Sequence, residues 1–148
     1  KLRKHKSNIA LSSDFIVGFP GENDKDFQDT MDLIHHVGFM NSYSFKYSPR
    51  PGTPAADREQ IPLKIQDDRL KIMQTTLDQQ QIDFNKKFLS KKLDVLISSS
   101  GKYKGQVKGK SEFNQSVAIP GNPNIIGDIV PVQITDISVH SLIGKAEV

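Results

Sequence analysis

Residues 43–56 read YSFKYSPRPGTPAA, and the first half of this stretch decides how the surrounding chain folds. Aromatic residues at Tyr43, Phe45 and Tyr47 alternate with serine and lysine, so the aromatic rings would share one face of an extended chain. This period of two predicts a β-strand over residues 43–48.

The second half of the stretch predicts a rigid loop at the end of that strand. Its three prolines each fix one φ angle and push the preceding residue towards extended geometry. Arg50 and Thr53 are therefore held in a frame that loses little entropy when it becomes ordered. Such a loop suits a binding site at a strand end, and it is equally compatible with a stiff connector.

Residues 11–38 predict a strand and a helix that precede this strand. The run LSSDFIVGF at residues 11–19 ends in Pro20-Gly21, the pattern of a buried strand followed by a turn. Asn23 is a good N-cap, apolar residues then recur at helical spacing, and Gly38 ends the helix. A strand–helix–strand order predicts two parallel strands, and hence an α/β fold.

The rest of the chain predicts one long helix, or two shorter ones, followed by a small all-β domain. Residues 63–89 have helical composition and periodicity, with Pro62 at the expected start. Five short strands follow, at residues 93–97, 105–109, 116–119, 129–134 and 141–148. Short strands separated by turn residues suggest a closed or nearly closed barrel, similar to oligonucleotide-binding (OB) folds. We therefore expect two domains, residues 1–88 and 89–148, with the boundary near residues 85–91.

Composition excludes several kinds of site. The 148 residues include no cysteine, which excludes disulfides, thiolate zinc sites and cysteine-held iron–sulfur clusters within this chain. His35 and His36 are adjacent on a predicted helix and point about 100° apart, so we expect no metal site there. No apolar run approaches the 18 residues of a membrane span, and a cytoplasmic location without a membrane partner is expected.

Positive charge is concentrated in the predicted barrel. Residues 1–85 carry 11 Lys and Arg against 12 Asp and Glu, whereas residues 86–148 carry 9 against 5. A small basic β domain suits a nucleic-acid backbone, and exposed aromatic rings could stack on bases. The candidates for RNA binding are Lys102, Tyr103, Lys104, Lys108, Lys110 and Phe113. Lysines that alternate along a strand can also form a solvent-exposed face that binds nothing.

Three segments together resemble one enzyme family. The run DFIVGFPGE at residues 14–22 resembles the fifth-strand motif of radical SAM enzymes, and residues 43–56 resemble the sixth-strand region. Residues 133–145, QITDISVHSLIGK, resemble the TRAM domain, a small RNA-binding barrel. This combination is similar to the radical SAM methylthiotransferases, and SPRPGTPA resembles their MiaB-type, tRNA-modifying branch. The implied fold is the C-terminal remnant of a partial β/α radical SAM barrel followed by a TRAM domain.

The resemblance also implies roles for individual residues. Those matching the S-adenosylmethionine site are Ile16, Gly18, Phe19, Gly21, Tyr47 and Arg50. Lys46, Arg50 and Thr53 match positions that face the cofactor or the RNA substrate. The branch that modifies a ribosomal protein typically has acidic residues where Arg50 and Pro51 stand, so the resemblance favours a tRNA substrate.

By resemblance, the intact enzyme adds a methylthio group to carbon two of isopentenyladenosine beside the anticodon of tRNA. It uses S-adenosylmethionine and two [4Fe-4S] clusters and acts as a monomer on the anticodon stem-loop. Because this chain lacks the cluster cysteines, we expect a C-terminal part with no catalytic residue or metal ligand of its own, inert in isolation. The alternatives are a stand-alone RNA-binding TRAM module, or another branch acting on threonylcarbamoyladenosine in tRNA or on a ribosomal protein.

Overall fold

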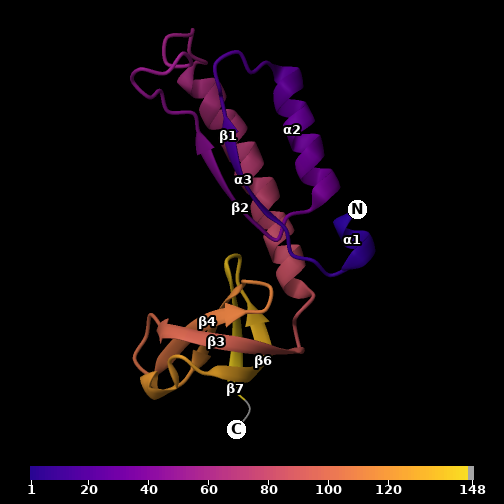
Figure 1. Cartoon of the computed structure of the whole chain (residues 1–148), viewed down its shortest axis with the longest axis vertical. Helices are drawn as coiled ribbons and strands as arrows, with labels where there is room; N and C mark the ends of the chain where they lie inside the picture. Colours follow the sequence, from indigo (N-terminus) through magenta and orange to yellow (C-terminus); the bar gives the residue numbers. More distant parts are fainter. Residues whose placement is uncertain (147–148) are drawn as a thin grey trace. The chain divides into compact units, whose positions relative to one another are not determined.

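The computed structural model describes residues 1–146, which divide into two compact units (Figure 1). One unit is residues 11–80, and the other combines residues 1–10 with the chain from Gln81 onward. The last two residues of the strand expected at 141–148 lie outside the described range.

The unit of residues 11–80 contains the expected strand–helix–strand arrangement. Strands β1 (Ser12–Val17) and β2 (Asn41–Lys46) flank helix α2 (Asp24–Val37) in sequence, and the long helix α3 (Leu63–Lys86) follows. The two strands pair in parallel, with Phe15 opposite Ser44 and Ile16 opposite Phe45. The predicted parallel pair is therefore confirmed, and α3 is one helix rather than two.

The ends of α2 are fixed by local hydrogen bonds. The Asn23 side chain accepts a hydrogen bond from the Asp26 N–H at 3.0 Å, and the Asp26 carboxylate accepts one from the Asn23 N–H at 3.1 Å. Gly38 ends the helix in a left-handed conformation with φ +62°. Both caps were predicted from the sequence, because each depends only on residues within one helical turn.

The two faces of the β1–β2 sheet differ in burial. Phe15 and Val17 point towards a core that also contains Met31 and Ile34 of α2 and Met73 and Leu77 of α3. The opposite face exposes apolar side chains, with Ile16 56%, Tyr43 63% and Phe45 54% exposed. The aromatic face of β2 is thus left uncovered by residues 1–146.

The other unit is a closed five-stranded barrel, as expected. Its strands are β3 (Lys92–Ser100), β4 (Gln106–Ser111), β5 (Ser116–Pro120), β6 (Ile129–Ile137) and β7 (Ser141–Ala146). Their order around the barrel is β3-β4-β5-β7-β6, and β5 and β7 pair in parallel. Two short helices, α1 (Leu2–His5) and the 3-10 helix η1 (Pro123–Ile125), were not predicted, since neither buries a residue that would give a sequence pattern.

Two glycines allow the barrel strands to approach each other closely where the register shifts. β3 has a bulge between Ile97 and Ser99, and a Cβ on Gly109 in the neighbouring strand would overlap the Leu96 carbonyl oxygen. β6 has a bulge between Ile134 and Asp136, and a Cβ on Gly144 would overlap Val132 and the Gln133 carbonyl oxygen. Bulges bend and twist strands, which helps such a short sheet to close on itself.

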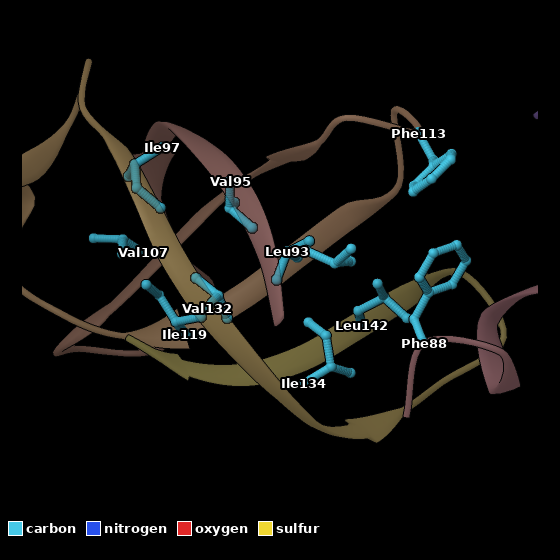
Figure 2. Packing of buried hydrophobic residues seen from close by; sticks show 11 residues of the cluster. Phe88, Leu93, Val95, Ile97, Val107, Phe113, Ile119, Val132, Ile134 and Leu142 are labelled. Carbon is cyan, nitrogen blue, oxygen red and sulfur yellow. The ribbon is translucent and has the colours of Figure 1, made fainter. Parts of the chain in front are cut away.

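The barrel core is aliphatic at its centre and aromatic at one end. Figure 2 shows Leu93, Val95 and Val132 in the middle, with Phe88 and Phe113 close together at one side. The ring centroids of Phe88 and Phe113 are 4.9 Å apart. The sequence-based role of Phe113 as a base-stacking ring is corrected here, because this side chain is only 8% exposed and belongs to the core.

The helices contain no membrane-spanning candidate. Within residues 1–146, none combines the length and the apolar character needed to cross a bilayer.

Candidate cofactor and nucleic-acid surfaces

A glycine turn connects β1 to α2 at the end of the sheet. Gly18 and Gly21 have φ values of +72° and +98°, which only glycine adopts without strain. The Glu22 N–H donates to the Phe19 carbonyl at 2.8 Å, closing the turn. The turn therefore presents Phe19 and the backbone around it immediately beyond the last residue of β1.

Glu22 and Arg69 hold this turn against α3. One Glu22 carboxylate oxygen accepts the Gly18 N–H at 3.1 Å and lies 2.6 Å from the Arg69 guanidinium. Arg69 also donates to the Asp24 carboxylate at 2.7 Å, and its guanidinium carbon lies 5.5 Å from the centre of the Phe27 ring. Burial alone would lower the pKa of Arg69, but its hydrogen bonds to Asp24 and Glu22 outweigh burial and raise that pKa above its usual range.

Gly18 and Gly21 leave room for side chains from other parts of this chain. A Cβ on Gly18 would come within 2.5 Å of the Gln66 side chain, and one on Gly21 within 2.5 Å of the Arg58 guanidinium. Gln66 is 4% exposed, and its amide nitrogen donates to the Ile61 carbonyl at 2.7 Å. The space beside Gly18 is thus occupied by α3. Packing against this helix requires a glycine at position 18, whether or not a ligand binds there.

Three of the predicted cofactor residues gather at this end of the sheet. The rings of Phe19 and Tyr47 meet edge to face, with centroids 5.1 Å apart. The Tyr47 N–H donates to the Val17 carbonyl at 2.8 Å, extending the strand pairing by one residue. Ile16 and Phe19 are exposed, so a small apolar and aromatic surface lies next to the glycine turn.

The remaining residues predicted for this region are placed differently. Lys46 pairs with Asp67 of α3 at 2.7 Å, on the strand face shared with Val17 rather than with Ile16. The Arg50 carbonyl accepts both the N–H and the hydroxyl of Thr53, at 3.2 and 2.8 Å, so the Thr53 hydroxyl closes the proline loop. The Arg50 side chain is exposed. Of these residues, Arg50 presents its charge to solvent most openly.

A pocket of about 310 Å³ lies beside the turn and contains residues that sequence reasoning missed. It is lined by Gly21, Arg58, Glu59, Gln60, Ile61 and Pro62. The Arg58 guanidinium carbon lies 6.0 Å from the centre of the Phe19 ring. Arg58, Glu22 and Arg69 could not be identified from the sequence, because their contacts join segments far apart and follow no local period.

On the barrel, two of the predicted basic residues stand on the outer face of β4. Lys108 and Lys110 alternate with the buried residues Val107 and Gly109 and are exposed. Lys108 lies between Ser99 of β3 and Ala118 of β5, and the Lys110 ammonium donates to the Asn114 carbonyl at 3.3 Å. The two lysines therefore form a short positive stripe on one side of the barrel.

The other basic candidates surround a second pocket, of about 730 Å³, at the β3–β4 loop. Lys102, Tyr103 and Lys104 all line it and are exposed, with Tyr103 66% exposed. The Lys102 ammonium lies 5.7 Å from the centre of the Tyr103 ring. This loop combines positive charge with an open aromatic ring.

The residues present do not fit an iron–sulfur cluster. The sequence contains no cysteine, and within residues 1–146 no group of three or more histidine or acidic side chains is arranged to hold a metal ion. The chain therefore has no cysteine to offer as a cluster ligand.

Comparison with known proteins finds a matching domain and similar enzymes. Residues 86–146 match the TRAM domain. The chain is 49% identical over 148 residues to a tRNA-2-methylthio-N(6)-dimethylallyladenosine synthase of Rickettsia rickettsii, strain Sheila Smith, and 50% identical to one of Rickettsia prowazekii. Each alignment covers 98% of this chain and 33% of the relative, so the chain spans about a third of the length of these curated relatives. Over nearly its whole length, this chain is therefore similar to about a third of these tRNA-modifying synthases, and its barrel matches the TRAM domain.

Proposed function

We propose that this chain forms the C-terminal third of a radical SAM enzyme that methylthiolates isopentenyladenosine beside the anticodon of tRNA. The observation that carries the proposal is the 49% identity, over nearly the whole chain, to relatives named for this reaction. In this proposal β1, α2 and β2 are the last part of a β/α barrel, and the TRAM barrel helps to hold the tRNA. The enzyme would act as a monomer in the cytoplasm.

The glycine turn fits one wall of a site for S-adenosylmethionine. Ile16 and Phe19 are exposed and the half-buried Tyr47 packs on Phe19, which gives an apolar surface at the end of the parallel strands, where ligands of β/α barrels bind. Gly18 and Gly21 shape the backbone beside that surface, and Arg50 supplies a positive charge on the following loop. When bound, S-adenosylmethionine would supply the methyl group and the radical. The residues of this chain would bind and orient it.

The proposal assigns tRNA contacts to both units. In the barrel unit, Lys102, Lys104, Lys108 and Lys110 are exposed and would neutralise backbone phosphates. Arg50, Thr53 and Lys46 belong to the other unit. Arg50 is the strongest candidate there, since Lys46 is paired with Asp67 and the Thr53 hydroxyl is bonded to the Arg50 carbonyl.

A chimeric enzyme tests the proposed reaction. This chain would replace the matching third of the Rickettsia rickettsii synthase, and the chimera would be expressed in a bacterium that lacks the modification. Mass spectrometry of tRNA nucleosides should then detect 2-methylthio-isopentenyladenosine. An Ile16→Asp chimera, which places a charge on the proposed cofactor surface, should lose the product while its iron content stays unchanged.

Two results would argue against the proposed reaction. One is a folded, iron-loaded chimera that leaves isopentenyladenosine unmodified. The other is a chimera that modifies threonylcarbamoyladenosine or a ribosomal protein, which would assign the chain to another branch of the family.

A second candidate function, RNA binding without catalysis, is favoured by the exposed lysine stripe on β4. If this chain binds tRNA alone, its affinity should fall steeply with salt, and Lys108→Ala should reduce the slope by about one phosphate contact. Binding that is insensitive to salt, or no binding, would leave the barrel as a packing element.

A further inference from the structure

The pocket at the β3–β4 loop has a composition that the general tRNA-binding role does not explain. It lies between residues 100–106 and 121–123 of the barrel unit, and its volume of about 730 Å³ falls within the range typical of small-ligand sites. We propose that it binds one unpaired nucleotide of the RNA, with the base stacked on Tyr103 and a phosphate beside Lys102 and Lys104. This inference rests on the proposed function, because it names the part of the RNA that the barrel recognises.

The loop is held in one shape by its own hydrogen bonds. The Gly101 N–H donates to the Gln106 carbonyl at 2.7 Å, and the Gln106 N–H donates to the Tyr103 carbonyl at 3.1 Å. The Gln106 side chain folds back and accepts the Lys102 N–H at 3.1 Å. The opposite wall is tied to the loop through Gly121, whose N–H donates to the Gly105 carbonyl at 2.9 Å. A loop ordered in advance loses little entropy when a ligand binds.

The charges of the lining favour an anion. Among its ten residues the only ionised side chains are the two lysines, and none is a carboxylate. The other residues are small or neutral, namely Ser100, Gly101, Gly105, Gln106, Gly121, Asn122 and Pro123. Gly105 has open space where a Cβ would stand, so a ligand can approach the backbone closely there. A phosphate near the two ammonium groups would therefore meet attraction and little steric hindrance.

Tyr103 gives the pocket its preference for a base. It is the only aromatic residue of the lining, and 66% of its surface is exposed, although burying a tyrosine ring is normally favourable. Lys102 lies over the ring at 5.7 Å, where its cation interacts with the π-system. A nucleobase stacked on this ring would cover the exposed surface while its phosphate meets the lysines.

The geometry of stacking selects an unpaired nucleotide. Both faces of a base inside a duplex are covered by its neighbours, so a protein ring can stack fully only on a base that has left the helix. Loops and ends of RNA offer such bases. The lysine stripe on β4, by contrast, can contact the phosphates of both paired and unpaired nucleotides.

Tyrosine fluorescence provides a direct test, because the chain has three tyrosines and no tryptophan. In the full chain with Tyr43→Phe and Tyr47→Phe, all tyrosine emission comes from Tyr103. A short single-stranded oligoadenylate should quench this emission, whereas an RNA duplex of equal length should bind without comparable quenching. Tyr103→Ala should weaken single-strand binding by about tenfold, and Tyr103→Phe by less than about twofold, because phenylalanine retains the stacking face.

Controls separate the failure of this inference from the failure of the proposed function. Lys91→Ala removes the same charge as Lys102→Ala but lies just before the opposite end of β3, and it should leave oligoadenylate affinity nearly unchanged. If the chain binds intact tRNA while Tyr103→Ala has no effect, or if duplex RNA quenches equally, the nucleotide pocket is wrong and tRNA binding stands. If the chain binds neither tRNA nor oligoadenylate, the nucleotide pocket and the binding of tRNA by this chain are both wrong.

Discussion

Arg69 shows how one residue can fix the conformation of a loop far away in sequence. The Arg69 side chain is 8% exposed, its guanidinium contacts Glu22 and Asp24, and Glu22 in turn accepts the Gly18 N–H. Because these contacts raise the pKa of Arg69, the guanidinium stays charged at any pH at which the protein would be studied. The glycine turn therefore depends on a residue of α3.

Replacing Arg69 by methionine should destabilise the unit of residues 11–80. Glu22, whose side chain is only 12% exposed, would lose its charged partner, and the loss should cost about 3 kcal/mol in urea unfolding. The matched control is Lys25→Met, which breaks the exposed pair with Asp29 and should leave the unfolding midpoint unchanged. An Arg69→Met chain as stable as the control would show that the buried pair contributes nothing.

At the scale of elements, the last turn of α3 is joined to the loops between the barrel strands by a buried polar network. The Asn85 amide nitrogen donates to the Ser138 and Val139 carbonyls at 3.3 and 3.2 Å, and its oxygen accepts from Gln115 at 2.7 Å. Gln115 also accepts the Ser111 hydroxyl at 3.1 Å. Asn85 is 1% exposed, so its hydrogen bonds cannot be replaced by water without rearrangement.

Asn85→Ala should destabilise the barrel unit by about 2–3 kcal/mol, since it leaves two carbonyls and the Gln115 amide without their partner. Lys71→Ala, on an exposed position of the same helix, should change stability by less than about 0.5 kcal/mol. A double-mutant cycle with Gln115→Ala measures the coupling. Strictly additive effects would contradict a connected network.

Barrel closure gives a second prediction at this scale. Gly109→Ala should destabilise the barrel by about 2 kcal/mol, because the new methyl group would overlap the Leu96 backbone at the β3 bulge. Gly105→Ala is the control, since Gly105 has φ +76° but open space around it, and it should cost roughly 1 kcal/mol or less. Since Gly109 does not have a positive φ, a loss in thermal unfolding no larger than that of the control would mean that the predicted steric overlap with Leu96 is relieved at little cost.

Across the whole molecule, sequence reasoning succeeded where structure depends on neighbouring residues. The alternation at Tyr43–Phe45, the capping pair of Asn23 and Asp26, and the change of period after Lys92 predicted the strands, the helix and the barrel. It failed where contacts join distant segments. Phe113 looked like an exposed ring in a polar stretch but packs on Phe88. The ion pair of Lys46 with Asp67, 21 residues later, was not predicted either.

The two units should differ in hydrogen exchange. The unit of residues 11–80 has a two-stranded sheet with one uncovered apolar face, whereas the barrel strands are each paired on both sides. Amides of β2 should therefore exchange faster than those of β3 and β6, as measured by mass spectrometry of the monomeric chain. Similar protection in both sheets would mean that the uncovered face costs the unit no stability.

The position of β7 affects how the barrel folds while the protein is being synthesised. β7 is last in sequence but lies between β5 and β6, so a nascent chain that has reached only β6 holds two unpaired strand edges. The barrel then has to stay open until the final strand inserts between them, and pairing of this non-local kind is slow. During that interval the open edges are the part of the chain most exposed to aggregation and to chaperones.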